Sequence, residues 1–391
     1  MFGGGENASY WGCGEGQHLR KRFPVAGYRA VSEYQQGEVY MCQDEIGFGV
    51  LGLGMGTHHA LAVSEVPGVK LVAVCDQDPM RMQPTAEKYG CRGYLSFEEM
   101  LSDPEIQAVT VATESGKHAE CALMAIAAGK HVLVEKPADV KVERIDEMIE
   151  AAKRAGVKVT SVFQSRTLPL NRCIKNAVDE GRFGKLVGVH ALVPWYREQS
   201  YYEGPHGDWK GTWALDGGGS LANQGVHTVD LLQFLVGRVK SVFGAFGVYA
   251  HDVEAEDTTT ALLKFENGAL GTISTATSAY PGMATSVTIL GWNGSVQKQD
   301  DVLHVWKFRD ETEEDEEIRK RYGPGDKSHV GVSSDPNALG AYGHHGHIED
   351  LAKCIREGCD PFITLESARH AVEIVNAIYE SGRTGKEVFL S

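Results

Sequence analysis

The sequence predicts an α/β fold in two parts, a doubly wound parallel sheet followed by an α+β domain with an open, mostly antiparallel sheet. The first observation is a set of short, uniformly apolar runs between residues 46 and 163 that alternate with amphipathic stretches. Uniformly apolar strands are typical of parallel sheets covered by helices on both faces. The second observation is that the runs beyond Leu168 lengthen, alternate polar with apolar residues, and are separated by Asn-Gly turns.

The length of 391 residues leaves room for two domains. Residues 1–44 show neither a helical nor a strand period, and we expect them to be a poorly structured N-terminal extension. We place the first domain at residues 45–165. The second domain is expected at residues 166–391 and closes with C-terminal helices.

Composition and charge exclude several classes of protein. Apolar residues (42%) and charged residues (23%) are in the proportions of a soluble globular protein. The net charge of −15 repels a phosphate backbone, so we expect no nucleic-acid partner. The chain contains no apolar run long enough for a membrane span and no apolar export segment after Arg20–Arg22, so we expect a cytoplasmic protein without a membrane partner. The eight cysteines show no paired spacing, which favours reduced thiols.

The first domain is expected to repeat strand and helix. One helix begins at Thr57, a second ends at Tyr89, and a further helix spans residues 142–155. Apolar runs predict strands at residues 47–54, 69–76, 106–113, 131–137 and 157–163. Ligands of such open sheets bind beyond the carboxyl ends of the strands.

The second domain is expected to begin with a helix at residues 170–180 and to end with helices at residues 346–357 and 367–381. Strands are predicted between them at residues 186–196, 239–250, 257–265, 269–279, 285–292 and 302–308. Residues 271–279 alternate hydroxyl with apolar side chains, so one face of the sheet is available for a ligand or partner. The acidic run 310–317 is expected to be a solvated loop or helix face.

A glycine-rich turn joins the first strand to the first helix. Gly52 permits a tight turn, and Gly54 lets a pyrophosphate approach the backbone. Met55 and Gly56 lead into the helix, whose free N–H groups attract anions. The spacing is G-x-G-x-G, one residue shorter than the usual fingerprint. In its strand-turn-helix context, this turn predicts a Rossmann-type dinucleotide site.

Asp76 ends the second strand, twenty residues beyond Gly56. A carboxylate at this position accepts hydrogen bonds from the ribose hydroxyls of an adenosine. Gln77 follows where an NADP site usually offers a cation, so NAD is favoured over NADP.

The segment Glu135-Lys136-Pro137 places a lysine just past the carboxyl end of a strand. Proline stiffens this link and fixes the position of the residues before it. The Lys136 ammonium is therefore a candidate to hold or polarise a substrate oxygen beside a nicotinamide. An ordinary surface lysine is the alternative interpretation.

Several short motifs occur in order along the chain, at residues 52–60, 113–118, 128–131, 135–137, 217–219, 223–232 and 379–386. Together they resemble the Gfo/Idh/MocA family of nicotinamide-dependent oxidoreductases. The resemblance implies a Rossmann domain and a second domain whose open sheet often forms homodimers or homotetramers. It also implies oxidation or reduction at a carbinol of a sugar, cyclitol or nucleotide-linked sugar.

The resemblance assigns site residues as well. It implies that Lys136 and His227 are catalytic. It further implies cofactor contacts from Thr113, Glu114, His118, Glu135 and Lys136. The chain departs from the family where Asn223 replaces the aspartate of the inositol dehydrogenases, which removes the carboxylate of a proton relay, and where Thr113-Glu114-Ser115 replaces Thr-Pro-Asn.

Asn223 and His227 are four residues apart on the helix expected after the triple glycine, so they would project from one face. Asp230 lies three residues beyond His227 and is a candidate to orient the imidazole. Because an imidazole pKa near 6.5 suits proton transfer at neutral pH, we expect His227 to take the hydroxyl proton. Lys136 would hold the same oxygen while hydride leaves for the nicotinamide. A structural histidine is the alternative.

Aromatic and basic side chains supply candidates for the substrate pocket. They are Arg166, Trp195, Arg197, Tyr202 and Trp213. Aromatic rings stack on the C–H faces of a pyranose, and arginine binds carboxylates or phosphates. A subunit interface or ordinary core accounts for the same residues equally well.

Three histidines, His344, His345 and His347, lie close together near the C-terminus. No carboxylate or cysteine motif accompanies them, so we predict no metal site and expect helix-capping or pocket-rim positions.

The expected function is NAD-dependent hydride transfer between nicotinamide and a ring carbinol or ketone of a sugar, glycoside, cyclitol or nucleotide sugar. One alternative is a redox-assisted glycoside hydrolase that uses tightly held NAD. The other is a non-catalytic NAD-binding regulator. Release of an aglycone without net NADH would identify the hydrolase.

Overall fold

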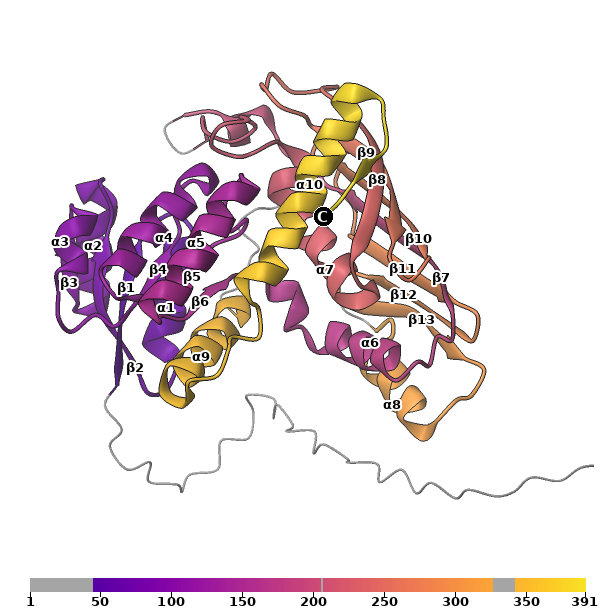
Figure 1. The fold of residues 1–391 in the computed structure, drawn as a ribbon, viewed down its shortest axis with the longest axis horizontal. Helices are drawn as coiled ribbons and strands as arrows, with labels where there is room; N and C mark the ends of the chain where they lie inside the picture. The colour runs from indigo at the N-terminus through magenta and orange to yellow at the C-terminus, as the bar shows by residue number, and fades with distance from the viewer. Residues whose placement is uncertain (1–44, 205–206, 326–341) are drawn as a thin grey trace, which may run out of the picture. The chain divides into compact units, whose positions relative to one another are not determined.

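The computed structural model describes residues 45–204, 207–325 and 342–391, which form two sheets with their covering helices (Figure 1). The predicted N-terminal extension, residues 1–44, lies outside the described residues. None of the described helices is both long and apolar enough to span a membrane.

The first sheet has six parallel strands in the order β3-β2-β1-β4-β5-β6. The strands are β1 (Ile46–Leu51), β2 (Val69–Cys75), β3 (Arg92–Tyr94), β4 (Ala108–Val111), β5 (His131–Val134) and β6 (Val159–Ser161). Every residue of β1 and β4 is buried, which explains the uniformly apolar runs. The strand order reverses between β1 and β4, so the turn after β1 lies at the point where ligands of such sheets bind.

The helices of this sheet are α1 (Gly56–Glu65), α2 (Pro79–Tyr89), α3 (Phe97–Leu101), α4 (His118–Ala127) and α5 (Val142–Ala155). The predicted doubly wound parallel sheet is confirmed. β3 was not predicted, because its three residues are exposed or half-buried and leave no apolar run in the sequence.

The second sheet has eight strands in the order β13-β12-β11-β7-β10-β9-β8-β14. Its strands are β7 (Leu186–Pro194), β8 (Val239–Gly247), β9 (Thr258–Phe265), β10 (Leu270–Ala276), β11 (Ser286–Gly291), β12 (Gly294–Gln299), β13 (Val302–Phe308) and β14 (Val388–Phe389). All neighbours are antiparallel except β7 and β10, which confirms a mostly antiparallel sheet. The strand β12 was not predicted, because its sequence, Gly-Ser-Val-Gln-Lys-Gln, is mostly polar and contains no apolar run.

The remaining helices are α6 (Pro169–Asp179), α7 (Val226–Val236), α8 (Glu313–Tyr322), α9 (Tyr342–Glu357) and α10 (Leu365–Thr384). The predicted acidic run supplies the first turn of α8, so it belongs in part to a helix. α10, the long yellow helix of Figure 1, contacts α5 of the first domain and β8 of the second.

The predicted boundary at residue 166 puts all C-terminal helices in the second domain. One of them, α9, instead contacts the first domain. α9 packs against the first sheet, where its residues Ile348 and Leu351 share a core with Ile46, Phe48 and Val63. The chain therefore returns to the nucleotide-type domain after completing the second sheet.

Asp315 ties α8 to the second sheet. Its carboxylate accepts hydrogen bonds from Arg182 Nη1 and Nη2 at 2.7 and 2.6 Å, and from the Trp306 indole N–H at 2.5 Å. Burial alone would raise the pKa of Asp315. The hydrogen bonds from Arg182, Trp306 and Thr312 outweigh burial and hold that pKa well below its usual range.

We expect Asp315→Asn to lower the free energy of unfolding by about 2–4 kcal/mol at neutral pH, because Arg182 loses its counter-charge. Since folding lowers the pKa of Asp315, its stabilisation is present above the unfolded pKa of about 3.9 and is lost as the pH falls toward the folded value. Urea unfolding of the variant and the parent should therefore differ less at acid pH. Glu314→Gln, at an exposed neighbour, is the matched control, and an equal loss in both variants would contradict this role.

Candidate active site

The glycine-rich turn between β1 and α1 has the shape of a dinucleotide cradle. Gly52 has a φ of +82°, and a Cβ there would lie 2.5 Å from the carbonyl oxygen of Ala112. Gly54 is exposed, and a Cβ there would meet only Arg81, at 3.7 Å. Open space over Gly54, with the start of α1 at Gly56 behind it, fits a pyrophosphate. Met55 is half-buried at the helix start.

Asp76 follows β2 and lies beside this turn. One carboxylate oxygen accepts the Leu53 N–H at 2.7 Å, and the other accepts the Asp78 N–H at 2.9 Å. Each oxygen keeps a second lone pair, so the carboxylate can still accept hydrogen bonds from ribose hydroxyls. Asp76 thus shapes the turn and presents an acceptor at its edge.

Lys136 follows β5 and reaches across to the second domain. Its Nζ donates to the backbone oxygen of Asn223 at 3.0 Å and to the Asn223 Oδ1 at 3.3 Å. The peptide bond between Lys136 and Pro137 is cis. Burial lowers the pKa of Lys136, and the negative charges of Glu135 and Asp216 oppose that shift.

The triple glycine allows the backbone to approach a buried carboxylate. A Cβ on Gly219 would lie 1.7 Å from the carbonyl oxygen of Glu256. The Glu256 carboxylate accepts the Gly219 and Leu221 N–H groups, at 3.1 and 2.9 Å, and the Tyr379 hydroxyl at 2.7 Å. Sequence reasoning missed Glu256, although Tyr379 opens the last of the family motifs. This network fixes the segment that carries Asn223.

The predicted regular helix after the glycines is wrong in detail. Ser220–Gly225 forms a π-helical turn (η4), and only then does α7 begin. π-Helical turns occur frequently at functional sites because they redirect side chains. Asn223 lies in this turn and touches Lys136, while His227 lies in the first turn of α7.

His227 is half-buried, and no hydrogen bond between described residues engages its ring. Its ring stands edge-on to Phe163 at a centroid distance of 6.4 Å. Burial, assisted by the charge of Lys136, lowers the pKa of His227 to about 3. The imidazole is therefore neutral at physiological pH, the state that a general base requires.

Asp230 does not orient His227, contrary to the expectation. It is fully buried and accepts hydrogen bonds from Arg166 Nε at 2.7 Å and from Arg166 Nη2, as well as from Gln233 Nε2 at 3.0 Å. Arg166 is itself buried, so the predicted substrate contact is replaced by a structural ion pair. The helix places Asp230 on its inner face, where only a partnered carboxylate is tolerated.

Asp216 is a buried carboxylate that the sequence analysis missed. It accepts hydrogen bonds from Asn223 Nδ2 and from the Gly211 N–H, both at 2.8 Å. Asn223 thus joins the Asp216 carboxylate to the Lys136 ammonium. Burial raises the pKa of Asp216 to about 7, against the hydrogen bonds and against the charges of Lys136 and Lys210. The only sequence signal was an acid directly before the triple glycine.

The predicted aromatic candidates divide into two groups. Tyr202 is buried and donates to Thr277 Oγ1 at 2.8 Å, and half-buried Trp213 stands edge-on to Tyr379 at 5.0 Å. Their predicted contacts with the substrate stay predictions. Large rings in irregular loops are expected to fill such a core.

Arg197 and Trp195 lie nearer the site. The Arg197 guanidinium packs over the Trp195 ring and over the Tyr201 ring, at 5.2 and 5.4 Å. Lys210 Nζ lies 3.7 Å from the centroid of the same Tyr201 ring. The charge of Lys210 interacts with those of Lys136 and Arg197. Lys136 and Lys210 are the two cations that act on Asp216.

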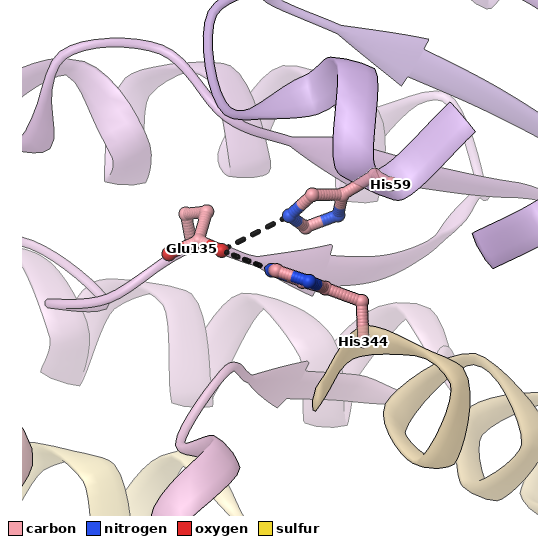
Figure 2. A group of neighbouring side chains, drawn as sticks. All are labelled: His59, Glu135 and His344. Atoms are coloured by element: carbon pink, nitrogen blue, oxygen red, sulfur yellow. Dashed lines mark hydrogen bonds and ion pairs between the residues drawn. The ribbon is translucent and has the colours of Figure 1, made fainter. Parts of the chain in front are cut away.

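Two predicted cofactor residues have buried partners. The ring nitrogens of buried His118 lie 2.7 Å from the Pro137 oxygen and 3.0 Å from the Thr113 oxygen, so it holds two loops together. The Glu135 carboxylate lies against His59 and His344, as Figure 2 shows. Their predicted contacts with the cofactor stay predictions.

Thr113 and Glu114 remain at the end of β4. Thr113 is half-buried, and Glu114 pairs with Lys117 at 3.3 Å. Their predicted contacts with the cofactor stay predictions.

Comparisons with known proteins agree with this geometry. Residues 46–163 match the family model described as an oxidoreductase family with an NAD-binding Rossmann fold, and residues 171–297 match the GFO/IDH/MocA C-terminal domain. The chain is 31% identical to the WlbA dehydrogenase of Bordetella pertussis, whose structure is a complex with NADH and UDP-GlcNAcA. That likeness covers 89% of this chain and 99% of the other, with a TM-score of 0.79. The chain belongs to the Gfo/Idh/MocA family.

Two further relatives match the chain at lower identity. The chain is 29% identical over 255 residues to a myo-inositol 2-dehydrogenase of Thermotoga maritima, which covers 63% of this chain and 73% of that protein. It is 26% identical over 378 residues to the levoglucosan dehydrogenase of Pseudarthrobacter phenanthrenivorans, covering 85% and 95%. The protein is therefore an oxidoreductase, and the prediction of NAD as its cofactor is confirmed.

We expect the ionisation of Asp216 to make stability depend on pH. Because its folded pKa of about 7 exceeds the unfolded 3.8, the folded state holds the proton more tightly, and the free energy of unfolding falls as pH rises between these values. The groups that face it are Lys136, Lys210 and Tyr201.

Asp216→Asn removes this ionisable group. The fall in the free energy of unfolding between about pH 4 and pH 7 should therefore become smaller by about 2–4 kcal/mol. Denaturant unfolding at several pH values measures it. Asp208→Asn, at an exposed position in the same loop, is the control. Parallel pH profiles for the parent and Asp216→Asn would refute the assignment.

Proposed function

We propose that this protein transfers hydride between NAD and a ring carbinol or ketone of a sugar. The observation that carries the proposal is that Lys136 of the first domain touches Asn223 of the second, beside a neutral His227 and within the site that follows the parallel strands. A cation and a base at one point are the groups that alcohol oxidation needs.

In the oxidative direction, the substrate hydroxyl lies between Lys136 and His227. NAD, when bound, would supply the acceptor for the hydride of the carbinol carbon. His227 takes the hydroxyl proton, and the electron pair of the broken O–H bond becomes the second bond of the ketone. Lys136 donates a hydrogen bond to the oxygen throughout and stabilises its developing negative charge. Asn223 and Asp216 position the ammonium.

We further propose that the substrate is an anionic, nucleotide-linked sugar. Lys210 and Arg197 place positive charge beside Lys136, where a carboxylate or phosphate would be bound. The WlbA dehydrogenase, whose complex contains UDP-GlcNAcA, is similar over nearly its whole length and supports this class.

A cytoplasmic homodimer or homotetramer is the assembly that we propose. Large apolar side chains on β7, β8, β9, β10 and β13 of the second sheet are exposed: Val187, Leu192, Phe243, Leu262, Leu270 and Val305. Phe243 lies opposite Leu262 in the register of β8 and β9. Exposed apolar patches of this kind mark protein interfaces. The net charge of −15 supports the absence of a nucleic-acid partner.

Lys136→Met and His227→Ala are each expected to lower kcat by about 10²–10⁴-fold, because each removes one group of the proton-transfer pair. The measurement is NADH absorbance with UDP-sugars, UDP-sugar acids, glycosides and inositols as substrates. Lys153→Met and His304→Ala, both at exposed positions, are matched controls. Near-normal turnover in both site variants would contradict the proposal.

Aglycone release without net NADH would favour the redox-assisted hydrolase, and NAD binding without turnover of any substrate would favour a regulator.

Lys210→Met should raise KM about tenfold for a sugar acid or UDP-sugar and leave KM for an uncharged sugar unchanged, because it removes one charge-assisted hydrogen bond. Steady-state kinetics with a charged and an uncharged substrate pair separate the two effects. The control is Lys185→Met, at an exposed lysine that follows α6 in the sequence. An equal change for both substrates would exclude recognition of the anion.

A further inference from the structure

Three buried side chains from distant parts of the chain meet next to the segment that follows β5 and contains Lys136. They are His59 of α1, Glu135 at the end of β5, and His344 of α9 (Figure 2). One nitrogen or oxygen atom of each lies within 4.8 Å of the others. This His-Glu-His cluster is distinct from the proposed hydride-transfer pair, because none of its members is Lys136 or His227.

The atoms of the cluster converge on a single point. Nε2 of His59 and Nε2 of His344 each lie 3.0 Å from the same carboxylate oxygen, Oε1 of Glu135. Zn²⁺ binds imidazole nitrogen and carboxylate oxygen at about 2.0–2.2 Å, which separates neighbouring ligand atoms by about 3.0–3.5 Å. The two separations of 3.0 Å fit neighbouring ligands of one such ion, and they are also the lengths of hydrogen bonds.

A fourth side chain adjoins the cluster. Nε2 of His344 lies 3.0 Å from Glu135 Oε1 and 3.3 Å from the side-chain amide of Gln164. A half-turn of that amide exchanges its nitrogen for its oxygen, which then faces His344 as an acceptor. In this orientation the amide oxygen is available as a fourth ligand beside the two imidazoles and the carboxylate.

The surroundings suit a bound cation. Glu135 Oε2 accepts the Lys136 N–H at 2.9 Å, which orients the carboxylate and leaves Oε1 for a metal. Nδ1 of His59 and Nδ1 of His344 have no hydrogen-bond partner among the described residues, so Glu135 is the group that fixes the tautomer of the His59 ring in the absence of a cation. The two rings lie 4.4 Å apart, both turned toward Glu135.

We propose that His59, Glu135 and His344 bind a divalent transition-metal ion of the zinc class. Two imidazoles and a carboxylate are ligands of this class. Because all three residues are buried, the role is structural. The ion would fasten α9 and α1 to the turn that presents Lys136. The sequence analysis predicted no metal at His344 because the carboxylate lies 209 residues away along the chain.

The test is zinc content. The full chain is stripped with a chelator, dialysed against buffer containing ZnSO₄, desalted, and analysed by mass spectrometry for metal per chain. We expect one zinc per chain, and a visible absorption spectrum of four-coordinate cobalt when Co²⁺ replaces Zn²⁺. No NAD or substrate is added, so the outcome is independent of the proposed function.

The decisive variant is His344→Phe, which keeps an aromatic ring and removes the ligand. Its matched control is His345→Phe, the adjacent histidine, whose Nε2 lies 2.7 Å from the half-exposed Glu65. We expect His344→Phe to bind zinc at least tenfold more weakly and to lose the rise in Tm that zinc produces, while His345→Phe keeps both. Glu135→Gln, with its fold checked by circular dichroism, should behave as His344→Phe does. A parent chain without zinc, or a His344→Phe variant that retains one zinc per chain, would overturn the proposal.

Discussion

The contact between Lys136 and Asn223 is the constraint on which the site depends. Lys136 is fixed by the first sheet and Asn223 by the second, and their hydrogen bonds of 3.0 and 3.3 Å hold the two domains in register. Around this contact each domain contributes what the other lacks. The first brings the dinucleotide cradle and the cation, and the second brings the base and the carboxylate Asp216.

In the second domain, the position of Asn223 depends on close approach of the backbone at glycines rather than on packing of large side chains. Gly219 lets the chain approach Glu256, Gly218 lets it approach Tyr379, and the π-helical turn that follows contains Asn223. Tyr379 hydrogen-bonds to Glu256 from the last long helix. Residues near positions 219, 256 and 379 are thus coupled through one buried carboxylate, which explains why motifs so distant in the sequence occur in one protein.

Local patterns in the sequence predict the sheets, the helices and the strand-end lysine, because each depends on residues within about twenty positions. They do not predict which buried partner a polar side chain finds. Asp230 faces Arg166, Glu135 faces two histidines, and Asp216 faces Asn223. These partners lie 64, 76, 209 and 7 residues apart, and in the nearest pair Asn223 lies within an unpredicted π-helical turn. Tertiary packing, which has no period along the chain, decides them.

The return of α9 to the first sheet has a consequence for the synthesis of the protein. Ile348 and Leu351 cover apolar surface of β1 and α1 that is otherwise bare. A nascent chain that has emerged only as far as the end of β6 therefore carries a nucleotide-binding domain with an uncovered apolar side. The core of the first sheet is completed by α9, which is translated after strands β7 to β13, so this apolar side stays uncovered while those strands are synthesised.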